Sequence, residues 1–513
     1  MDKDLLNDPP LPRAVRERRL SLDGIWEVQL EPDRAFEPIV VPFTFEAALS
    51  GIGRPNEIHE HLTYRRRFRV PGDWAASNFL LHFGAVDWHA AVEVDGVQIG
   101  THTGGYAHFS FDLGVLDPST DHELVVVVDD PADGFQPRGK QRGSGGIWYA
   151  RATGIWRPVW LEAVPAAHIR SFELDAHVDG TVRVQVETTQ PVEVEVRVAG
   201  QRVRFRGETT IHVDEPALWS PEQPHLYDVV LETASGDAIE SYVAFRSIER
   251  RGNEVLLNGE RRTLCGVLDQ AYWPDGVYTA PDGASLRAEV EAVKRFGFDL
   301  ARMHVKVADP RWYAWCDRIG LLVAQDMPSP LHLATAGACD NFAAELAEIV
   351  AQLRGHPCVA IWVVINEDWG EPSEALQGAL VRQVRSTDPG RLVVDASGWK
   401  QRGDTDLIDV HDYDAELGGH SSSAELPLWI GECGGVSLVV GGEEDFAYRH
   451  VRSPEQLEAE YSRLIGGLGD VAGFVWTQLT DVEGELNGLV THDRRPKLAP
   501  EAIRAVNERL RAR

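Results

Sequence analysis

Two glutamates end apolar runs whose composition is otherwise typical of a buried strand. Glu367 closes the run 362–367, and Glu432 comes just after the run 426–430. Hydrolysis of a glycosidic bond needs two carboxyl groups that flank the bond, one of them protonated and the other ionised. An acid at the end of a strand more often caps a helix or pairs with an arginine, and this is the structural alternative. The pair predicts a carbohydrate-cleaving site if the two strands face each other.

Polar and aromatic residues also follow other apolar runs of the second half of the chain. They are Asp269, Arg302, His304, Asp326, Asn366, His411, Tyr413 and Trp476. Carboxylates and amides can bind sugar hydroxyls, and an indole can pack against the apolar face of a pyranose. Four of them have a structural alternative: a core ion pair for Arg302, a packed ring for Tyr413, and satisfied buried imidazoles for His304 and His411. Together they predict a carbohydrate substrate.

Eight apolar runs that alternate with helical segments must position these residues. They are 263–268, 300–304, 321–324, 359–365, 391–395, 407–411, 426–430 and 472–476. Helical spacing of apolar residues is clear at 286–296, at 342–353 with Asp340 as the candidate cap, and after Ser453. Apolar strands separated by helices predict a parallel sheet that is covered on both faces. Eight such units predict a (β/α)8 barrel over 250–513, and a doubly wound open sheet is the alternative.

The barrel would place the candidate residues at one end. Active sites of such barrels lie at the C-terminal ends of the strands, which is where all of these residues stand. The fourth and seventh strands lie across the mouth from each other, so Glu367 and Glu432 can face each other over a sugar ring. Carboxyl groups about 5–5.5 Å apart give hydrolysis with retention, and groups about 6.5–9.5 Å apart give inversion.

The first half of the chain has a different rhythm. Over 20–162, short runs such as 63–70 and 123–129 alternate in polarity and are broken by turn residues. This pattern predicts an all-β sandwich or jelly roll. A second segment of short alternating strands, 165–248, predicts an immunoglobulin-like sandwich. We therefore expect a jelly roll over 1–164, an immunoglobulin-like sandwich over 165–249 and a catalytic (β/α)8 TIM barrel over 250–513.

Composition narrows the possible partners. The 513 residues carry 80 acids against 50 bases, a net charge of −30, so a nucleic acid would be repelled at long range. No apolar run is long enough to span a membrane, and the charged N-terminus does not resemble a secretory signal. The five cysteines form no C-x-x-C pair, which favours a reduced cytoplasmic protein. No motif for a metal or a phosphate-bearing cofactor is present, so none is expected.

Several motifs resemble glycoside hydrolase family 2, the family of β-galactosidases, β-glucuronidases and β-mannosidases. His356-Pro357 followed by Asn366-Glu367 resembles its acid/base segment, and Trp429-Ile-Gly-Glu-Cys-Gly-Gly435 resembles its nucleophile segment. Phe474-Val-Trp-Thr-Gln478 resembles the eighth strand, and Gly154-Ile-Trp-Arg-Pro-Val-Trp160 resembles the family's jelly roll. The resemblance covers about 20–505, and the order sandwich, sandwich, barrel is more specific than any single motif.

The resemblance implies a retaining exo-glycosidase. Glu432 would attack the anomeric carbon, and Glu367 would protonate the leaving oxygen and then activate water. Asn366 would bind the 2-hydroxyl, while Arg302 and Tyr413 would hold Glu432 ionised. Trp476 would line the sugar site.

One departure concerns the sugar. The glucuronidase branch carries an Asn-x-Lys motif that grips the sugar carboxylate, whereas the matching place here has Glu485-Leu-Asn487. A uronic acid would meet a negative charge there, so a neutral or amino sugar is favoured, although Glu485 could instead pair with Arg494. The segment 145–149 of the jelly roll could reach the barrel mouth or form a simple turn.

The best single expectation is a β-galactosidase. The alternatives are β-mannosidase, exo-β-glucosaminidase, α-L-arabinopyranosidase, β-uronidase, or a carbohydrate-binding protein without catalysis. The exposed faces of the sandwiches make a homodimer plausible.

Overall fold

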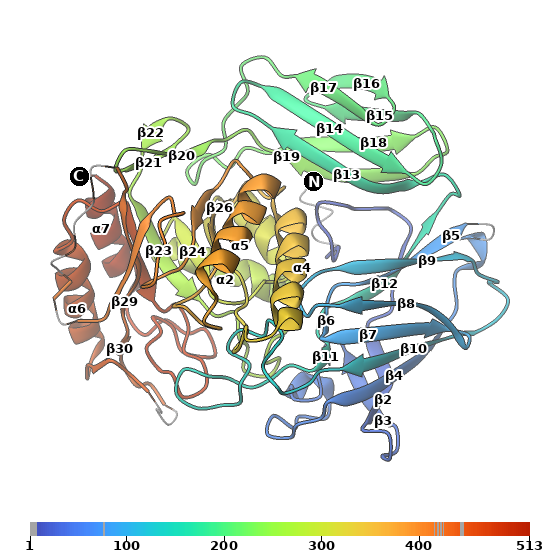
Figure 1. Ribbon diagram of the computed structural model, residues 1–513, viewed down its shortest axis with the longest axis horizontal. Coiled ribbons are helices and arrows are strands. Elements are labelled where there is room, and N and C mark those ends of the chain that lie inside the picture. The colour runs from blue at the N-terminus through green and yellow to red at the C-terminus, as the bar shows by residue number, and fades with distance from the viewer. Residues whose placement is uncertain are drawn as a thin grey trace.

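The computed structural model describes residues 8–512 apart from 75–76, 415, 418–419, 421–422, 424 and 442–445. The chain forms two β-sandwiches and one barrel (Figure 1). The first sandwich, in blue and teal, and the second, in green, lie on one side of the barrel, which runs from yellow to red. The expected order of sandwiches and barrel is thus confirmed.

The first sandwich packs a six-stranded sheet, β3-β2-β4-β10-β7-β8, against a four-stranded sheet, β1-β12-β5-β9. Its strands are β1 Arg19–Ser21, β2 Gly24–Leu30, β3 Glu37–Val41, β4 His61–Phe68, β5 Asn78–Phe83, β7 His89–Val94, β8 Val97–Thr103, β9 Phe109–Val115, β10 His122–Asp129 and β12 Val159–Val164. The pair β6 Val86–Asp87 and β11 Gly154–Ile155 lies apart, and two 3-10 turns are η1 Ala48–Ser50 and η2 Gly72–Trp74. In β10 buried residues alternate strictly with half-buried ones, so one face of the strand turns to the core.

The second sandwich has a three-stranded and a four-stranded sheet, β13-β14-β17 and β16-β15-β18-β19. Its strands are β13 Ile169–Ala176, β14 Thr181–Thr188, β15 Val194–Val198, β16 Gln201–Phe205, β17 Glu208–His212, β18 Tyr227–Thr233 and β19 Ala238–Val243. Its core is a cluster of valines with Leu231 and Phe245. The small sheet β20 Ile248–Arg251, β21 Glu254–Leu257 and β22 Glu260–Arg261 then leads into the barrel.

The barrel sheet has the order β27-β26-β25-β24-β23-β32-β29-β28, and all its neighbouring pairs are parallel. The strands are β23 Leu264–Asp269, β24 Leu300–Met303, β25 Leu322–Asp326, β26 Val359–Val363, β27 Leu392–Val394, β28 Ile408–Asp412, β29 Leu428–Gly434 and β32 Gly473–Thr477. Each overlaps one of the eight expected strands. A short pair, β30 Val436–Ser437 and β31 Arg449–His450, extends from the end of β29.

Helices cover most of the connections of the barrel. They are α2 Gly283–Arg295, α3 Pro310–Ile319, α4 Ala336–Leu353, α5 Glu374–Thr387, α6 Pro454–Gly466 and α7 Pro500–Arg511. α4 begins earlier than expected: the side chain of Thr335 accepts a hydrogen bond from the Ala338 amide, and Asp340 lies inside the helix. The described parts of the β27–β28 and β28–β29 connections contain no helix, so these two of the eight expected units are incomplete.

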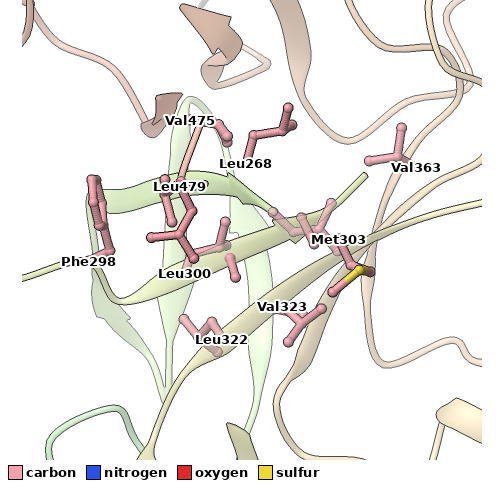
Figure 2. Close-up of a cluster of buried hydrophobic side chains, with 14 of the residues drawn as sticks. Leu268, Phe298, Leu300, Met303, Leu322, Val323, Val363, Val475 and Leu479 are labelled. Atoms are coloured by element: carbon pink, nitrogen blue, oxygen red, sulfur yellow. The ribbon is translucent and has the colours of Figure 1, made fainter. Parts of the chain in front are cut away.

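The barrel strands are held together by apolar packing. Figure 2 shows Leu300, Leu322 and Val475, from three different strands, in one cluster of buried side chains. Because both faces of a parallel sheet are covered, such strands are apolar throughout. A polar residue in them therefore needs a partner in the barrel. Within the described residues, no helix has both the length and the apolar character needed to cross a membrane.

The two sandwiches are tied to each other and to the barrel by buried polar groups. Arg16 joins Glu162 of the first sandwich (2.7 Å) to Asp237 of the second (2.9 Å). Arg157 of the first sandwich donates to the carbonyl oxygens of Val307 (2.6 Å) and Ala308 (2.8 Å) after β24. These bonds fix the sandwich against the barrel mouth.

The second sandwich is anchored through a buried carboxylate of the barrel. The Tyr242 hydroxyl donates to Asp317 Oδ2 (2.7 Å), which also contacts His356 Nδ1 (2.6 Å). The Trp219 indole donates to the Asp317 carbonyl (2.7 Å). A hydrogen bond to a buried charge contributes about 1.5–3 kcal/mol.

We predict that Tyr242→Phe lowers the free energy of unfolding by about 1.5–3 kcal/mol, because Asp317 loses a buried donor. Tyr227→Phe is the matched control. Tyr227 lies in the same sandwich, and its hydroxyl accepts from the exposed Ala217 amide, so its loss should cost less. Urea unfolding followed by fluorescence and calorimetry compares the two. Equal losses in both variants would contradict the anchoring role of Asp317.

Candidate active site

The C-terminal ends of the barrel strands bring most of the expected residues into one buried network. Arg302 on β24 is at its centre, and its side chain is 0% exposed. Its guanidinium donates to Asp326 Oδ1 (2.9 Å), Glu432 Oε1 (3.1 Å) and Asn366 Oδ1 (2.9 Å). One side chain thus connects the ends of β25, β26 and β29. Two expectations for Arg302 were a buried ion pair in the barrel and a contact with Glu432. The structure combines them, because Arg302 forms buried ion pairs with both Asp326 and Glu432.

Glu432 is held at both carboxylate oxygens. Its Oε1 accepts from Arg302, and its Oε2 accepts from the Tyr413 hydroxyl at 2.5 Å. Burial alone would raise the pKa of Glu432, but the positive charges of His411 and Arg302 outweigh it and lower that pKa to about 2. The carboxylate is therefore ionised, and its orientation is fixed by hydrogen bonds to both oxygens. These are the properties of a nucleophile or of an electrostatic stabiliser.

Glu367 stands beside His411, which also lies near Glu432. His411 Nδ1 is 2.6 Å from Glu367 Oε1 and 3.6 Å from Glu432 Oε1. Burial opposes a charge on His411, yet the Glu432 carboxylate and the hydrogen bond to Glu367 raise its pKa. An oxygen of Glu367 and an oxygen of Glu432 lie within 4.8 Å of each other. This spacing matches the arrangement of carboxyl groups that gives retention and is too short for inversion.

The backbone at Glu367 is unusual. Its φ of +48° lies in the left-handed region, as does that of Asp368 at +61°. Residues other than glycine rarely adopt this conformation, and it is found at functional sites where the surroundings enforce it. The Glu367 amide donates to Ser397 Oγ (3.3 Å), and Ser397 in turn donates to Asn366 Oδ1 (2.9 Å). Ser397 was missed in the sequence because nothing in its surroundings marks it.

The side-chain amide of Asn366 belongs to the same buried network. Its Oδ1 accepts from Arg302 and Ser397, which fixes the orientation of the amide. Its Nδ2 is buried and has no hydrogen-bond partner among the described residues. A buried donor without an acceptor is costly, and a ligand hydroxyl would satisfy it.

His304 and Asp326 lie next to Glu432 in the same buried network. His304 Nδ1 is 2.9 Å from Asp326 Oδ2 and 3.9 Å from Glu432 Oε1. Burial lowers the pKa of His304, whereas Arg302 and His304 together keep the pKa of Asp326 below its ordinary value against the effect of burial. Asp326 thus orients two groups that touch Glu432.

Two expected residues lie elsewhere. Trp476 does not line the pocket: its buried indole packs against Tyr461 of α6, with ring centroids 4.7 Å apart. Because side chains of a strand alternate, the next residue, Thr477, faces the site and lies 3.1 Å from the Tyr413 hydroxyl. Asp269 is buried at the end of β23 and accepts from the Ala271 amide (2.8 Å). Burial and the nearby Glu289 raise the pKa of Asp269, which favours its neutral form.

Glu485 follows β32 and meets the first sandwich. Its Oε2 accepts from the Tyr149 hydroxyl (2.5 Å), and its Oε1 accepts from Asn487 Nδ2 (3.0 Å). The pairing of Glu485 with Arg494 is wrong, since Arg494 pairs with Glu289 at 2.9 Å. The cation beside Glu485 is Lys140, with its Nζ at 3.8 Å. The segment 145–149 does reach the barrel.

Aromatic residues also lie near the mouth of the barrel, and two of them, Trp369 and Tyr448, were missed in the sequence. Trp148 of the first sandwich packs against Trp369 of the barrel, with centroids 4.9 Å apart. Tyr448 stacks on Tyr413 at 3.7 Å with nearly parallel planes. Trp148 lies in the segment 145–149, for which contact with the barrel mouth was one of two expectations, whereas no signal in the sequence marked Trp369 and Tyr448.

Within the part of the chain that the structure describes, two groups of side chains have the spacing of metal ligands. They are Glu367, His411 and Glu432 at the mouth, and Asp317, His356 and Cys358 beneath the barrel. In the first group, the donor atoms already bind one another and Arg302, and the imidazole is biased toward its charged form, which is a poor ligand. In the second group, Asp317 is engaged by Tyr242, His356 and the Cys358 amide. Neither arrangement favours a resident ion.

The comparisons with known proteins agree with this geometry. Residues 166–246 match the family model described as glycosyl hydrolases family 2. A β-glucuronidase of Paenibacillus borealis is 24% identical, over 94% of this chain and 96% of that protein. A β-galactosidase of Aeromonas hydrophila is 28% identical over 67% of this chain and 37% of its own length, and one of Klebsiella pneumoniae is 28% identical over 76% and 42%. The chain thus spans less than half the length of these two relatives.

Solved structures share the fold across nearly the whole chain. A β-galacturonidase of Eisenbergiella tayi has a TM-score of 0.80 at 20% identity, covering 97% of both chains. A β-glucuronidase of Ruminococcus gnavus has a TM-score of 0.81 at 19% identity, covering 97% of this chain and 99% of the other. At these identities the likeness concerns the arrangement of sandwiches and barrel. Taken with the family match over residues 166–246 and the relatives in sequence, it supports a relationship to family 2 of the glycosyl hydrolases.

Proposed function

We propose that the protein is a retaining exo-β-glycosidase. The observation that carries the proposal is the pair Glu367 and Glu432, whose oxygens lie within 4.8 Å while the charges of His411 and Arg302 keep Glu432 ionised. An ionised carboxylate next to a second carboxyl group at retaining distance is what a double displacement requires. The family match over residues 166–246 and the glycosidase names of the relatives support the same reaction class.

In the first step, Glu432 attacks the anomeric carbon of a terminal sugar. The bond from this carbon to the glycosidic oxygen breaks, and Glu367 donates its proton to that oxygen, so the aglycone leaves as an alcohol. Tyr413 and Arg302 orient both oxygens of Glu432 before the attack, which lowers the cost of reaching the reactive geometry.

In the second step, Glu367 acts as a base. It takes a proton from a water molecule, whose oxygen attacks the anomeric carbon and displaces Glu432. The sugar leaves with its original configuration, and both glutamates return to their starting states. Asn366 Nδ2, which has no partner among the described residues, is the group proposed to bind the 2-hydroxyl through both steps.

The sugar is proposed to be neutral, with β-galactoside as the leading substrate. Glu485, buried and 3.8 Å from Lys140, forms a neutral pair that offers no net positive charge to a uronic acid. The relatives include β-galactosidases and β-glucuronidases, and a solved neighbour is a β-galacturonidase. β-Mannoside, glucosaminide, α-L-arabinopyranoside and β-uronide hydrolysis are therefore the alternatives that a substrate panel must separate.

The test of the function is turnover of 4-nitrophenyl β-glycosides with the product followed by proton NMR. We expect the β anomer to appear first. Glu432→Gln should reduce kcat about 10³-fold or more, because the nucleophile is lost. Glu508→Gln, an exposed position on α7, is the matched control and should keep full activity. An α anomer as the first product, or a Glu432→Gln variant near wild-type activity, would refute the double displacement.

Glu367→Ala should separate the two roles of the acid/base residue. A substrate with a dinitrophenolate leaving group needs no acid, so it should still form the glycosyl-enzyme, whereas an alkyl glycoside should be hydrolysed about 10²–10⁴-fold more slowly. Added azide, which needs no base, should then accelerate turnover and yield a β-glycosyl azide. Loss of activity on both kinds of substrate without azide rescue would speak against Glu367 as the acid/base.

The pH dependence of kcat/KM should show how the charge of His411 affects the pKa of Glu432. In wild type, His411 helps to lower the pKa of Glu432 to about 2. In His411→Asn the carboxylate loses this charge while its burial persists, so its pKa rises and the acid limb moves to higher pH by about 1–3 pH units. His212→Asn, on the exposed edge of the second sandwich, is the control. An unmoved acid limb would mean that His411 does not control Glu432.

A further inference from the structure

The connection from β10 to β11, residues 130–153, leaves the first sandwich and lies across the mouth of the barrel. The amide of Gly139 donates to the Ser329 carbonyl (3.1 Å), and the amide of Ala150 donates to Glu483 Oε1 (2.8 Å). Gly139 has a φ of +59°, and a Cβ there would lie 2.1 Å from the Val305 carbonyl oxygen. Only glycine allows this approach. The loop is therefore held on the barrel at both ends.

This loop places a lysine in the site. The Lys140 side chain is 6% exposed, and its Nζ lies 3.8 Å from Glu485 Oε2 and 5.1 Å from the Tyr149 ring centroid. Among the described residues, no oxygen accepts a hydrogen bond from this ammonium within normal distance. A buried ammonium with all its donors unused is unfavourable, so this group is suited to donate to a ligand.

The charge of Lys140 reaches the catalytic residues. After burial itself, the Lys140 ammonium is among the groups that act on His304, and it contributes to lowering the pKa of this imidazole. His304 Nδ1 is in turn 3.9 Å from Glu432 Oε1. Lys140 therefore lies close enough for its charge to act on His304, which stands beside Glu432, although the lysine comes from a different part of the fold.

The side chain of Glu485 is held in place by hydrogen bonds to both of its carboxylate oxygens. Tyr149 and Asn487 donate to its two oxygens, at 2.5 and 3.0 Å. Lys140 thus faces a carboxylate that is already hydrogen-bonded by other donors, and the two opposite charges leave no net charge for an ionic substrate. A hydroxyl group, which both donates and accepts, is the partner that fits such a pair.

The position of the pair in the barrel indicates which part of a sugar it meets. Glu485 follows β32, whereas Asn366 and Glu367 follow β26, and these two strands are four places apart in the eight-strand order. They therefore lie on opposite sides of the mouth. A pyranose whose carbons 1 and 2 face Glu367 and Asn366 would turn carbons 4 to 6 toward the opposite side.

We propose that Lys140 and Glu485 together form the binding element for the 4- or 6-hydroxyl of a neutral sugar, with Lys140 Nζ as the donor. This inference rests on the proposed glycosidase function and adds a specificity-determining residue from the first sandwich. The two halves of the element come from separate bodies of the fold, so the selectivity of the enzyme depends on their docking.

The experiment compares Lys140→Met with Lys140→Arg on 4-nitrophenyl β-galactoside, its 4-epimer the β-glucoside, and its 6-deoxy analogue the β-fucoside. Lys140→Met should lower kcat/KM for the best of these sugars about 10- to 100-fold, as expected for a lost charged hydrogen bond. It should lower kcat/KM much less for the analogue that lacks the contacted hydroxyl. Lys140→Arg, which keeps a cation, should recover part of the preference.

Controls separate selectivity from folding. Arg67→Met removes a cation from the same sandwich at a side chain that is 80% exposed, and it should leave the whole panel unchanged. The melting temperature of each variant is measured alongside. If Lys140→Met lowers kcat/KM for all three substrates by the same factor, Lys140 only supports the fold of the loop and the proposal is wrong.

Glu485→Gln tests the neutral-sugar part of the proposal. Removing the negative charge should leave Lys140 as an unbalanced cation and raise kcat/KM for 4-nitrophenyl β-glucuronide relative to the galactoside at least about tenfold. If wild type already prefers the glucuronide and Lys140→Met abolishes that preference, Lys140 binds a carboxylate and the neutral assignment is overturned.

Binding of free galactose and glucose to the Glu432→Gln protein, measured by calorimetry, does not depend on catalysis. Weaker binding of galactose after a further Lys140→Met change would support the proposal even if no glycoside is hydrolysed. Absence of hydrolysis would refute the glycosidase function, whereas the weaker binding would leave the sugar-binding role of Lys140 intact. Unchanged binding would refute the role of Lys140 alone.

Discussion

The buried guanidinium of Arg302 is the group on which the site depends. It is fully enclosed, and its hydrogen bonds go to Asp326, Glu432 and Asn366 at the ends of three strands. A buried cation is tolerated only when its donors and charge are matched, and removal of one partner leaves an uncompensated charge. The same contacts that join the strand ends therefore also favour the ionised form of Glu432, the proposed nucleophile, so folding and the proposed chemistry share one set of contacts.

The two glutamates differ because their surroundings differ. Glu432 is 7% exposed and lies beside Arg302, His411 and Tyr413, whereas Glu367 is 17% exposed and, among the described residues, forms an ion pair with His411. Two carboxyl groups of the same intrinsic acidity can take opposite roles when the positive charge is concentrated on one of them. His411 lies between them and can respond to the proton that Glu367 gains or gives up. Charge placement thus assigns the roles without any difference in residue type.

The eight strands and the glutamate pair could be predicted from the sequence, because apolar runs end abruptly at polar residues and all such ends meet at one face of a parallel barrel. The sequence could not predict which side chains of a strand point into the barrel and which point toward the surrounding helices. Residues 473–477 are buried on both faces, so their pattern does not distinguish Trp476, which packs on α6, from Thr477, which faces Tyr413. The Lys140–Glu485 contact joins residues that are far apart in the chain through a loop without periodicity, and no local signal marks it.

The loop 130–153 explains why the first sandwich and the barrel belong to one site. Tyr149 buries its hydroxyl against Glu485, and Arg157 binds carbonyls just after β24, the strand that carries Arg302. Without the sandwich, Glu485 would lose both its phenolic donor and the neighbouring ammonium and would be a carboxylate exposed at an open mouth. The barrel supplies the reacting groups, but the wall opposite Glu367 is built across the interface. If Lys140 and Glu485 select the sugar as proposed, a change in the docking of the two bodies would alter which sugar is accepted before it altered the chemistry proposed at Glu432.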